Sequence, residues 1–188
     1  NYDGSSWTES GDLPTGNEGQ AGCGTQTAAL SIGGTDFNTP VVYIESFEYD
    51  GSSWTAAGDM PAARNQVGRA GTQTAALACG SEPGYVVTTI KYNGTAWTAG
   101  DNMNTGRAKV SGAGTQTAAL MAAGSIPALT SNVETYDGSS WTEVTNANTA
   151  RKATGGFGIQ TAALIVGGQS PPHVAITETY DGSSWTEV

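Results

Sequence analysis

The chain has 188 residues, the size of one ordinary domain or two very small ones, and glycine alone supplies 27 of them. Only 13% of the residues are charged and 37% are hydrophobic, which favours a turn-rich β protein, because glycine is costly inside helices and strands but suited to turns. The formal net charge of −10 would repel a phosphate backbone, so we expect no nucleic-acid partner. The longest near-continuous apolar run, 118–123, is too short for membrane insertion.

The sequence repeats itself, and this is its main signal. The string Tyr-Asp-Gly-Ser-Ser-Trp-Thr begins at positions 2, 49, 136 and 180, and the variant Tyr-Asn-Gly-Thr-Ala-Trp-Thr begins at position 92. The five tryptophans are therefore 47, 43, 44 and 44 residues apart. A second string, Gln-Thr-Ala-Ala-Leu, starts 19 residues after the tryptophan in all four intervals. We infer a single domain over 1–188 with repeat units at about 9–55, 56–98, 99–142 and 143–186, and with the hairpin motif at 1–8 left over.

In chain order, the last unit predicts four short strands, at about 153–159, 162–166, 176–180 and 184–188. The Asp-Gly pairs, and Asn-Gly in the second unit, predict a tight hairpin between the third and fourth strands, since these residues tolerate positive φ angles. The second strand is apolar on both pleat faces, so it must lie between two sheets. No segment shows sustained helical periodicity. A four-stranded unit of about 44 residues predicts an all-β β-propeller, in which each unit is one antiparallel blade.

The two cysteines, Cys23 and Cys79, are too few for a disulfide framework, and their spacing matches no metal motif. Cys79 stands where the other units have Ile32, Ala122 and Val166, so we expect it to be a small buried hydrophobe. We expect no metal and no cofactor. The chain begins at Asn1 rather than at a methionine, which suggests a mature product or a part of a longer protein.

These units resemble the kelch repeat family, whose marks are a glycine doublet after the second strand, a tyrosine in the third and a tryptophan in the fourth. The glycine doublet is present in the first and last units as Gly33-Gly34 and Gly167-Gly168. The two middle units keep one glycine of it, in Gly80-Ser81 and Ala123-Gly124. The matching aromatic residues are Tyr49, Tyr92, Tyr136 and Tyr180 with Trp54, Trp97, Trp141 and Trp185. Arg64, Arg107 and Arg151 follow their tryptophans by ten residues, as in many kelch-like units, while Asn17 takes that place in the first unit.

The interval from tyrosine to tryptophan is shorter than is usual for kelch, so the chain looks like a variant with a tighter hairpin. The uniform Gln-Thr-Ala-Ala-Leu string also resembles uncharacterised kelch-like repeats in phage and marine environmental structural proteins. The resemblance implies the fold and carries little about function. The uniformity is equally what recent duplication or deliberate design would produce.

Most repeated residues have a structural explanation. The aspartates of the Asp-Gly turns resemble the Asp-box of sialidases, but that motif needs one more residue before the tryptophan, and we expect turn residues that bond to their own backbone. We expect the tryptophans to pack between blades rather than stack on sugars. We expect the three arginines to bond backbone carbonyls or a neighbouring acid rather than line an anion site.

An enzyme is disfavoured. His173 is the single histidine, so the chain lacks the two histidines and the crosslinked cysteine–tyrosine pair of copper oxidases such as galactose oxidase. No serine stands in a strained elbow to use His173 as a base. Glycoside hydrolysis needs two positioned carboxylates. Glu134 and Glu178 each stand two residues before a tyrosine, and their repetition predicts outward-facing strand residues. A glycan-processing enzyme is kept as a remote alternative.

The variable parts of the repeat point to a binding surface. In a four-stranded antiparallel blade, the connection from the second to the third strand emerges opposite the two tight hairpins. The variable segments 35–43, 82–87, 125–132 and 169–175 all belong to that end, where binding residues commonly lie. Their aromatic members, Phe37, Tyr43, Tyr85 and His173, are our candidate ligand-binding residues. Neutral variation of loops is the alternative explanation.

We therefore expect a non-catalytic binding or structural module on an extracellular or virion surface, of the adhesin, tail-fibre or receptor-binding type, that binds a glycan or a protein surface. Few lysines, many threonines and the acidic charge suit such a surface. The rival hypothesis is an intracellular kelch-like adaptor that docks a protein. Five copies of the hairpin motif for four units predict ring closure in which Trp7 or Trp185 takes the last outer position. A compact four-bladed monomer is expected; a dimer or part of a longer chain is the alternative.

Overall fold

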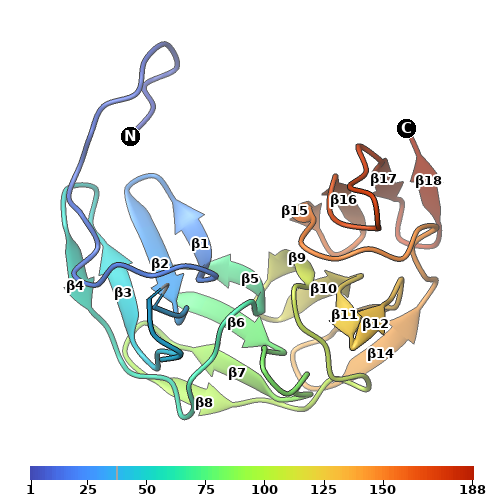
Figure 1. The fold of residues 1–188 in the computed structure, drawn as a ribbon, viewed down its shortest axis with the longest axis horizontal. Coiled ribbons are helices and arrows are strands. Elements are labelled where there is room, and N and C mark those ends of the chain that lie inside the picture. Colours follow the sequence, from blue (N-terminus) through green and yellow to red (C-terminus); the bar gives the residue numbers. More distant parts are fainter. Residues whose placement is uncertain (37) are drawn as a thin grey trace.

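The computed structural model describes residues 1–36 and 38–188, and it contains four antiparallel sheets of four strands each, arranged as the blades of a β-propeller (Figure 1). Blade 1 holds β1 (Ala21–Thr25), β2 (Ala28–Ile32), β3 (Ser46–Tyr49) and β4 (Trp54–Ala56). Blade 2 holds β5 (Gly68–Thr72), β6 (Ala75–Cys79), β7 (Thr89–Tyr92) and β8 (Trp97–Ala99). Blade 3 holds β9 (Ser111–Thr115), β10 (Ala118–Ala122), β13 (Val133–Tyr136) and β14 (Trp141–Val144). Blade 4 holds β15 (Gly155–Ile159), β16 (Ala162–Val166), β17 (Thr177–Tyr180) and β18 (Trp185–Glu187).

In every blade the strands pair in chain order, and a short hairpin of β11 (Ser125–Ile126) and β12 (Ala128–Leu129) lies in the connection between β10 and β13. The predicted second strand at 162–166 is confirmed, and the other three strands are shorter than predicted by one or two residues. The first strand begins at Gly155 because Ala153, at φ 55°, donates its N–H to Lys109 of the preceding blade instead. None of the described residues forms a helix long and apolar enough to cross a membrane.

Each blade packs on the next through a repeated apolar contact. The second strand of one blade supplies Leu77 and Cys79, and the following blade covers them with Tyr136 and Trp141. The alternate residue Ala78 faces the opposite way, into the core between blades 1 and 2. The second strand is thus buried on both faces, as predicted, because side chains alternate along a strand. Trp97, Trp141 and Trp185 pack between blades, as expected of residues that bury a large apolar area.

The four blades lie around a common channel lined by the inner strands β1, β5, β9 and β15. Successive inner strands pack together from β1 to β5, β5 to β9 and β9 to β15. Glycine permits this approach at Gly112 and Gly156, where a Cβ atom would overlap the main chain of the preceding blade.

The prediction of four blades is confirmed, but the expectation that they close into a ring is wrong. The arc is open between blade 4 and blade 1, and no comparable packing joins β15 to β1 in the described part of the chain (Figure 1). Trp185 occupies the outer strand of blade 4 while Trp7 is displaced and 80% exposed. The terminal hairpin at 2–8 contacts blade 1, where Gln26 donates to the carbonyl of Tyr2 at 2.8 Å.

Candidate functional site

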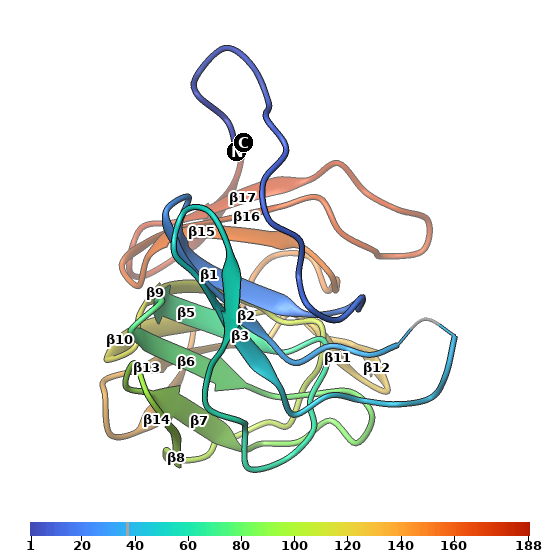
Figure 2. The ribbon, with the colours of Figure 1, turned by 90° about the vertical axis from the view of Figure 1, so that its left-hand side faces the viewer.

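The connections from the second to the third strand of all four blades emerge at the same end of the molecule, which we call the loop end (Figure 2). They span 33–45, 80–88, 123–132 and 167–176. The tight hairpins carrying the Gln-Thr and Asp-Gly strings lie at the opposite end, which we call the turn end. The predicted separation of variable loops from uniform turns follows from the antiparallel order within each blade.

A backbone hydrogen bond closes the base of each variable connection. The N–H that follows the second strand donates to the carbonyl that precedes the third strand in every blade. The four bonds join Gly33 to Glu45 (3.0 Å), Gly80 to Thr88 (3.3 Å), Ala123 to Asn132 (2.9 Å) and Gly167 to Ile176 (2.9 Å). The ends of the loops are therefore fixed whatever the loop between them contains.

Buried arginines reinforce two of these loop bases. The Nη1 of Arg107 donates to the carbonyls of Ala123 and Asn132, at 3.2 and 2.6 Å, and so holds both ends of one connection. Arg64 does the same in blade 2, where its Nη1 donates to Gly80 and Thr88 at 3.2 and 3.3 Å. Asn17 replaces the arginine in the first unit, and its Nδ2 donates to Gly33 at 3.1 Å.

Glu134 forms a buried ion pair with Arg107, and Glu178 forms one with Arg151. These ion pairs correct the prediction that the two glutamates face outward. Arg107 lies 2.9 Å from Glu134 and Arg151 lies 3.0 Å from Glu178, with no side-chain exposure in any of the four. A residue two before the tyrosine shares its pleat face, and that face is buried against the preceding blade. Burial lowers the pKa of Arg107, and the carboxylate of Glu134 partly offsets this.

Of the predicted ligand-binding residues, Tyr43, Tyr85 and His173 lie at the loop end but are not gathered into one cavity. Phe37 lies outside the described residues. Tyr43 and Tyr85 are half-buried, and His173 is exposed beside Gln169, with which it forms a β-bridge. Tyr43 donates its N–H to the carbonyl of Gly34 at 2.9 Å, which holds the outgoing arm of the first connection.

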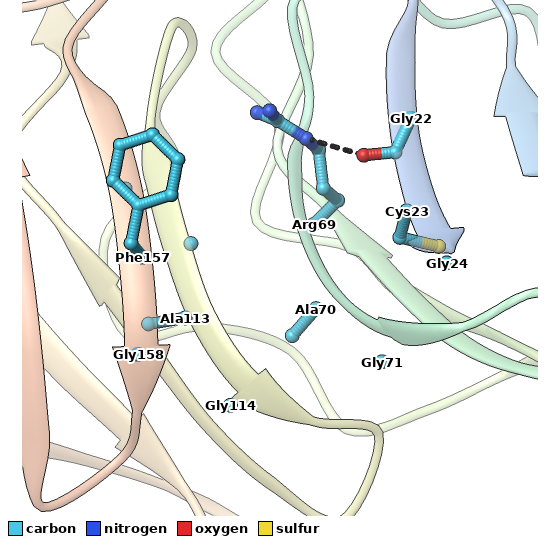
Figure 3. Close-up of a pocket in the computed structure, with 12 residues that line it drawn as sticks. Gly22, Cys23, Gly24, Arg69, Ala70, Gly71, Ala113, Gly114, Phe157 and Gly158 are labelled. Carbon is cyan, nitrogen blue, oxygen red and sulfur yellow. Dashed lines mark hydrogen bonds between the residues drawn. The ribbon is translucent and has the colours of Figure 1, made fainter. Parts of the chain in front are cut away.

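A cavity of about 320 Å³ in the channel was not predicted (Figure 3). Arg69 of β5 and Phe157 of β15 are its large side chains, and the remaining lining is mostly glycine and alanine. The Nε of Arg69 donates to the carbonyl of Gly22 at 2.9 Å. Cys23 also lines the cavity, and burial raises its pKa to about 11 although Arg69 partly opposes this. The sequence signal was available: Arg69 stands where the other units have glycine, and Phe157 where they have cysteine or alanine.

The Asp-Gly turns hold their own backbone. One carboxylate oxygen of Asp50 accepts the N–H groups of Ser52 and Ser53, each at 2.8 Å. These bonds, that of Ser53 first, hold the pKa of Asp50 well below its usual range. No group of three metal-ligating side chains comes together within 1–36 and 38–188.

Comparison with protein-family models and with curated proteins gives no match for this chain.

Proposed function

We propose that the chain is a non-catalytic binding module that presents the variable connections of its loop end to a glycan or a protein surface. The observation that carries this proposal is the fixed base of every connection. A backbone hydrogen bond holds the base of every connection, and Arg107 reinforces one of these bases. The segments between the bases differ in length and sequence, while the blades that carry them are constant. Binding residues commonly lie on loops held in this way by a rigid framework.

The kelch-like repeat pattern and the surface composition extend the proposal. We assign the chain to a kelch-like variant and place its work on an extracellular or virion surface, as an adhesin, tail-fibre or receptor-binding module. The support is the acidic surface with few lysines, which suits prolonged exposure to solvent without aggregation. Tyr43, Tyr85, His173 and Phe37 are the aromatic groups of the loop end that would contact a ligand, since amphipathic rings supply much of the energy of recognition.

The test is a glycan-array screen of the chain beside a pull-down for protein partners. Saturable binding to a glycan is expected, with the affinity falling about tenfold or more in His173→Ala or Tyr85→Asn. Asparagine is chosen because Tyr85 has a positive φ of 47° that asparagine tolerates. Thr95→Ala, in an exposed turn of the turn end, is the control and should bind like the parent.

A stable protein partner whose capture needs the same loop residues would favour the adaptor form of the module over the adhesin. Binding that is lost in Thr95→Ala but kept in both loop variants would place the surface at the turn end and refute the proposal.

A further inference from the structure

The terminal hairpin at 2–8 is seated on blade 1 as though it were the outer half of a preceding blade. Its aromatic pair Tyr2 and Trp7 has ring centroids 5.2 Å apart, close to the 4.9–5.0 Å of the four pairs inside the blades. Gln26 of blade 1 donates to the carbonyl of Tyr2, and each later blade repeats this bond to the tyrosine of the blade before it. The repeated bonds are Gln73 to Tyr49, Gln116 to Tyr92 and Gln160 to Tyr136.

A second contact gives the hairpin the same position. Asn1 donates from Nδ2 to the phenol oxygen of Tyr49 at 3.2 Å. The corresponding residue of blade 1, Glu48, accepts a bond of 2.8 Å from the phenol of Tyr92 in blade 2. The residue just before the tyrosine thus contacts the phenol of the next blade in both cases.

The inner half of that preceding blade is what the described chain lacks. The three later glutamines each make a second bond to the inner half of the blade before, at the carbonyls of Ala29, Ala76 and Ala119. Gln26 has no such second acceptor in the described part of the chain. Trp7 is 80% exposed because no sheet of the described residues packs against it, whereas Trp97 and Trp141 are 7% exposed.

Blade 4 forms the other wall of the opening, and the apolar side chains on the face that it turns toward the opening are exposed. Phe157 of β15 is 58% exposed and Val166 of β16 is 36% exposed, while their counterparts in blade 3, Ala113 and Ala122, are 7% exposed and fully buried. The exposed residues form the face that blades 1 to 3 cover with the tyrosine and tryptophan of the next blade.

A series of backbone hydrogen bonds links successive blades along the mouth of the channel, and this series also ends at the opening. Gln66 donates to Gly19, Lys109 to Gln66 and Ala153 to Lys109, at 2.8, 2.8 and 3.0 Å. Within residues 1–36 and 38–188, the carbonyl of Ala153 and the N–H of Gly19 have no backbone partner that continues the series. One further inner strand would supply a partner for each.

We propose that the opening is a docking site for a two-stranded β-hairpin with the inner-strand sequence of this repeat, which completes a fifth blade whose outer half is the chain's own hairpin at 2–8. The three internal interfaces define the chemistry of the occupant. Its Gln-Thr turn would bond the carbonyls of Ala163 and Tyr180, as Gln160 bonds Ala119 and Tyr136. Its second strand is apolar on both faces, because it lies between blade 4 and blade 1. Its first strand requires a glycine at the position of Gly112 and Gly156, where a Cβ atom would overlap the main chain of the neighbouring blade.

The test uses the full chain and a fluorescent synthetic peptide of residues 151–168, which carries both inner strands of the last unit. Saturable binding and a higher melting temperature of the chain are expected, because a ligand that binds only the folded state stabilises it. Val166→Asp in the chain should weaken binding about tenfold or more, since it places a charge on the docking face. Val41→Asp, at an exposed position of a variable connection, should leave it unchanged. Deleting residues 1–8 should abolish binding.

A peptide carrying Gln160→Ala should also bind about tenfold more weakly, because it cannot bond the two carbonyls of blade 4. Absence of saturable binding, or equal binding to the parent and to Val166→Asp, would overturn the proposal. A sedimentation mass of two chains that the peptide does not reduce would put a second copy in the opening and would overturn it as well. These readouts do not depend on the ligand of the loop end.

Discussion

Removing the carboxylate of Glu134 should be among the most damaging changes to this protein. Its side chain is fully buried, and besides the ion pair with Arg107 it accepts the backbone N–H groups of Asn104 and Thr105, at 2.7 and 3.3 Å. Glu134→Ala therefore leaves a buried guanidinium without its counter-charge and two backbone donors of the link between blades 2 and 3 without an acceptor.

The expected loss in the free energy of unfolding is about 3–5 kcal/mol, the range for breaking a buried ion pair at one partner. With a urea dependence of about 2 kcal/mol per molar, the unfolding midpoint should fall by about 2 M. The assay is urea unfolding followed by tryptophan fluorescence. Glu143→Ala is the control, because that carboxylate is exposed and should matter by less than about 0.5 kcal/mol. A loss below about 1 kcal/mol for Glu134→Ala would refute the reasoning that the pair holds the blades together.

Three further changes have expected outcomes in the same unfolding assay. Gly112→Ala would push a methyl group into the backbone of β5 and should cost about 1–3 kcal/mol, whereas Gly22→Ala meets only a carbonyl 3.5 Å away and should be tolerated; equal losses would contradict the close packing of the inner strands. Trp185→Ala should cost about 3–5 kcal/mol and Trp7→Ala less than about 1, because only the former is buried; similar losses would show that the two hairpins exchange places. The depressed pKa of Asp50 means that its turn stabilises the fold above the unfolded-state pKa of about 4 and loses this as the pH falls below it, so the unfolding midpoint should drop between pH 5 and about 2, and less so in Asp50→Asn.

The blade could be predicted from the sequence because its signals are local. The Asp-Gly string carries its own turn, in which Asp50 bonds the next two N–H groups, and this needs no information from the rest of the chain. The second strand, which is apolar on both pleat faces, likewise predicts its own position between two neighbouring sheets. Both were confirmed, since turn chemistry and strand periodicity act over a few residues.

The prediction of outward-facing carboxylates at Glu134 and Glu178 is wrong because repetition along the chain does not indicate exposure. Glu134 stands two residues before Tyr136 and therefore shares its buried pleat face. The alternation of side chains along the strand thus predicts that Glu134 is buried. The second unit breaks the pairing of arginine with glutamate. Ile90 stands two residues before its tyrosine, and Arg64 donates to the hydroxyl of Thr88 instead.

The open ring could not be predicted from local sequence. The hairpins at 2–8 and 180–186 are identical in sequence, so nothing within either one says which should close the ring. The two hairpins differ in their surroundings, since Gln26 of blade 1 donates to the carbonyl of Tyr2, a contact that spans 24 residues. The channel side chains Arg69 and Phe157 depart from the repeat, so the repeat pattern does not predict them.

The central claim is that constant blades hold variable loops by their bases, and native-state hydrogen exchange measured by NMR tests it most directly. The base N–H groups of Gly80, Ala123 and Gly167 should exchange as slowly as the inner strands, while those of Tyr85 and His173 in the same connections exchange much faster. Bases that exchange as fast as the loops they carry would contradict the claim, because the loops would then have no fixed scaffold.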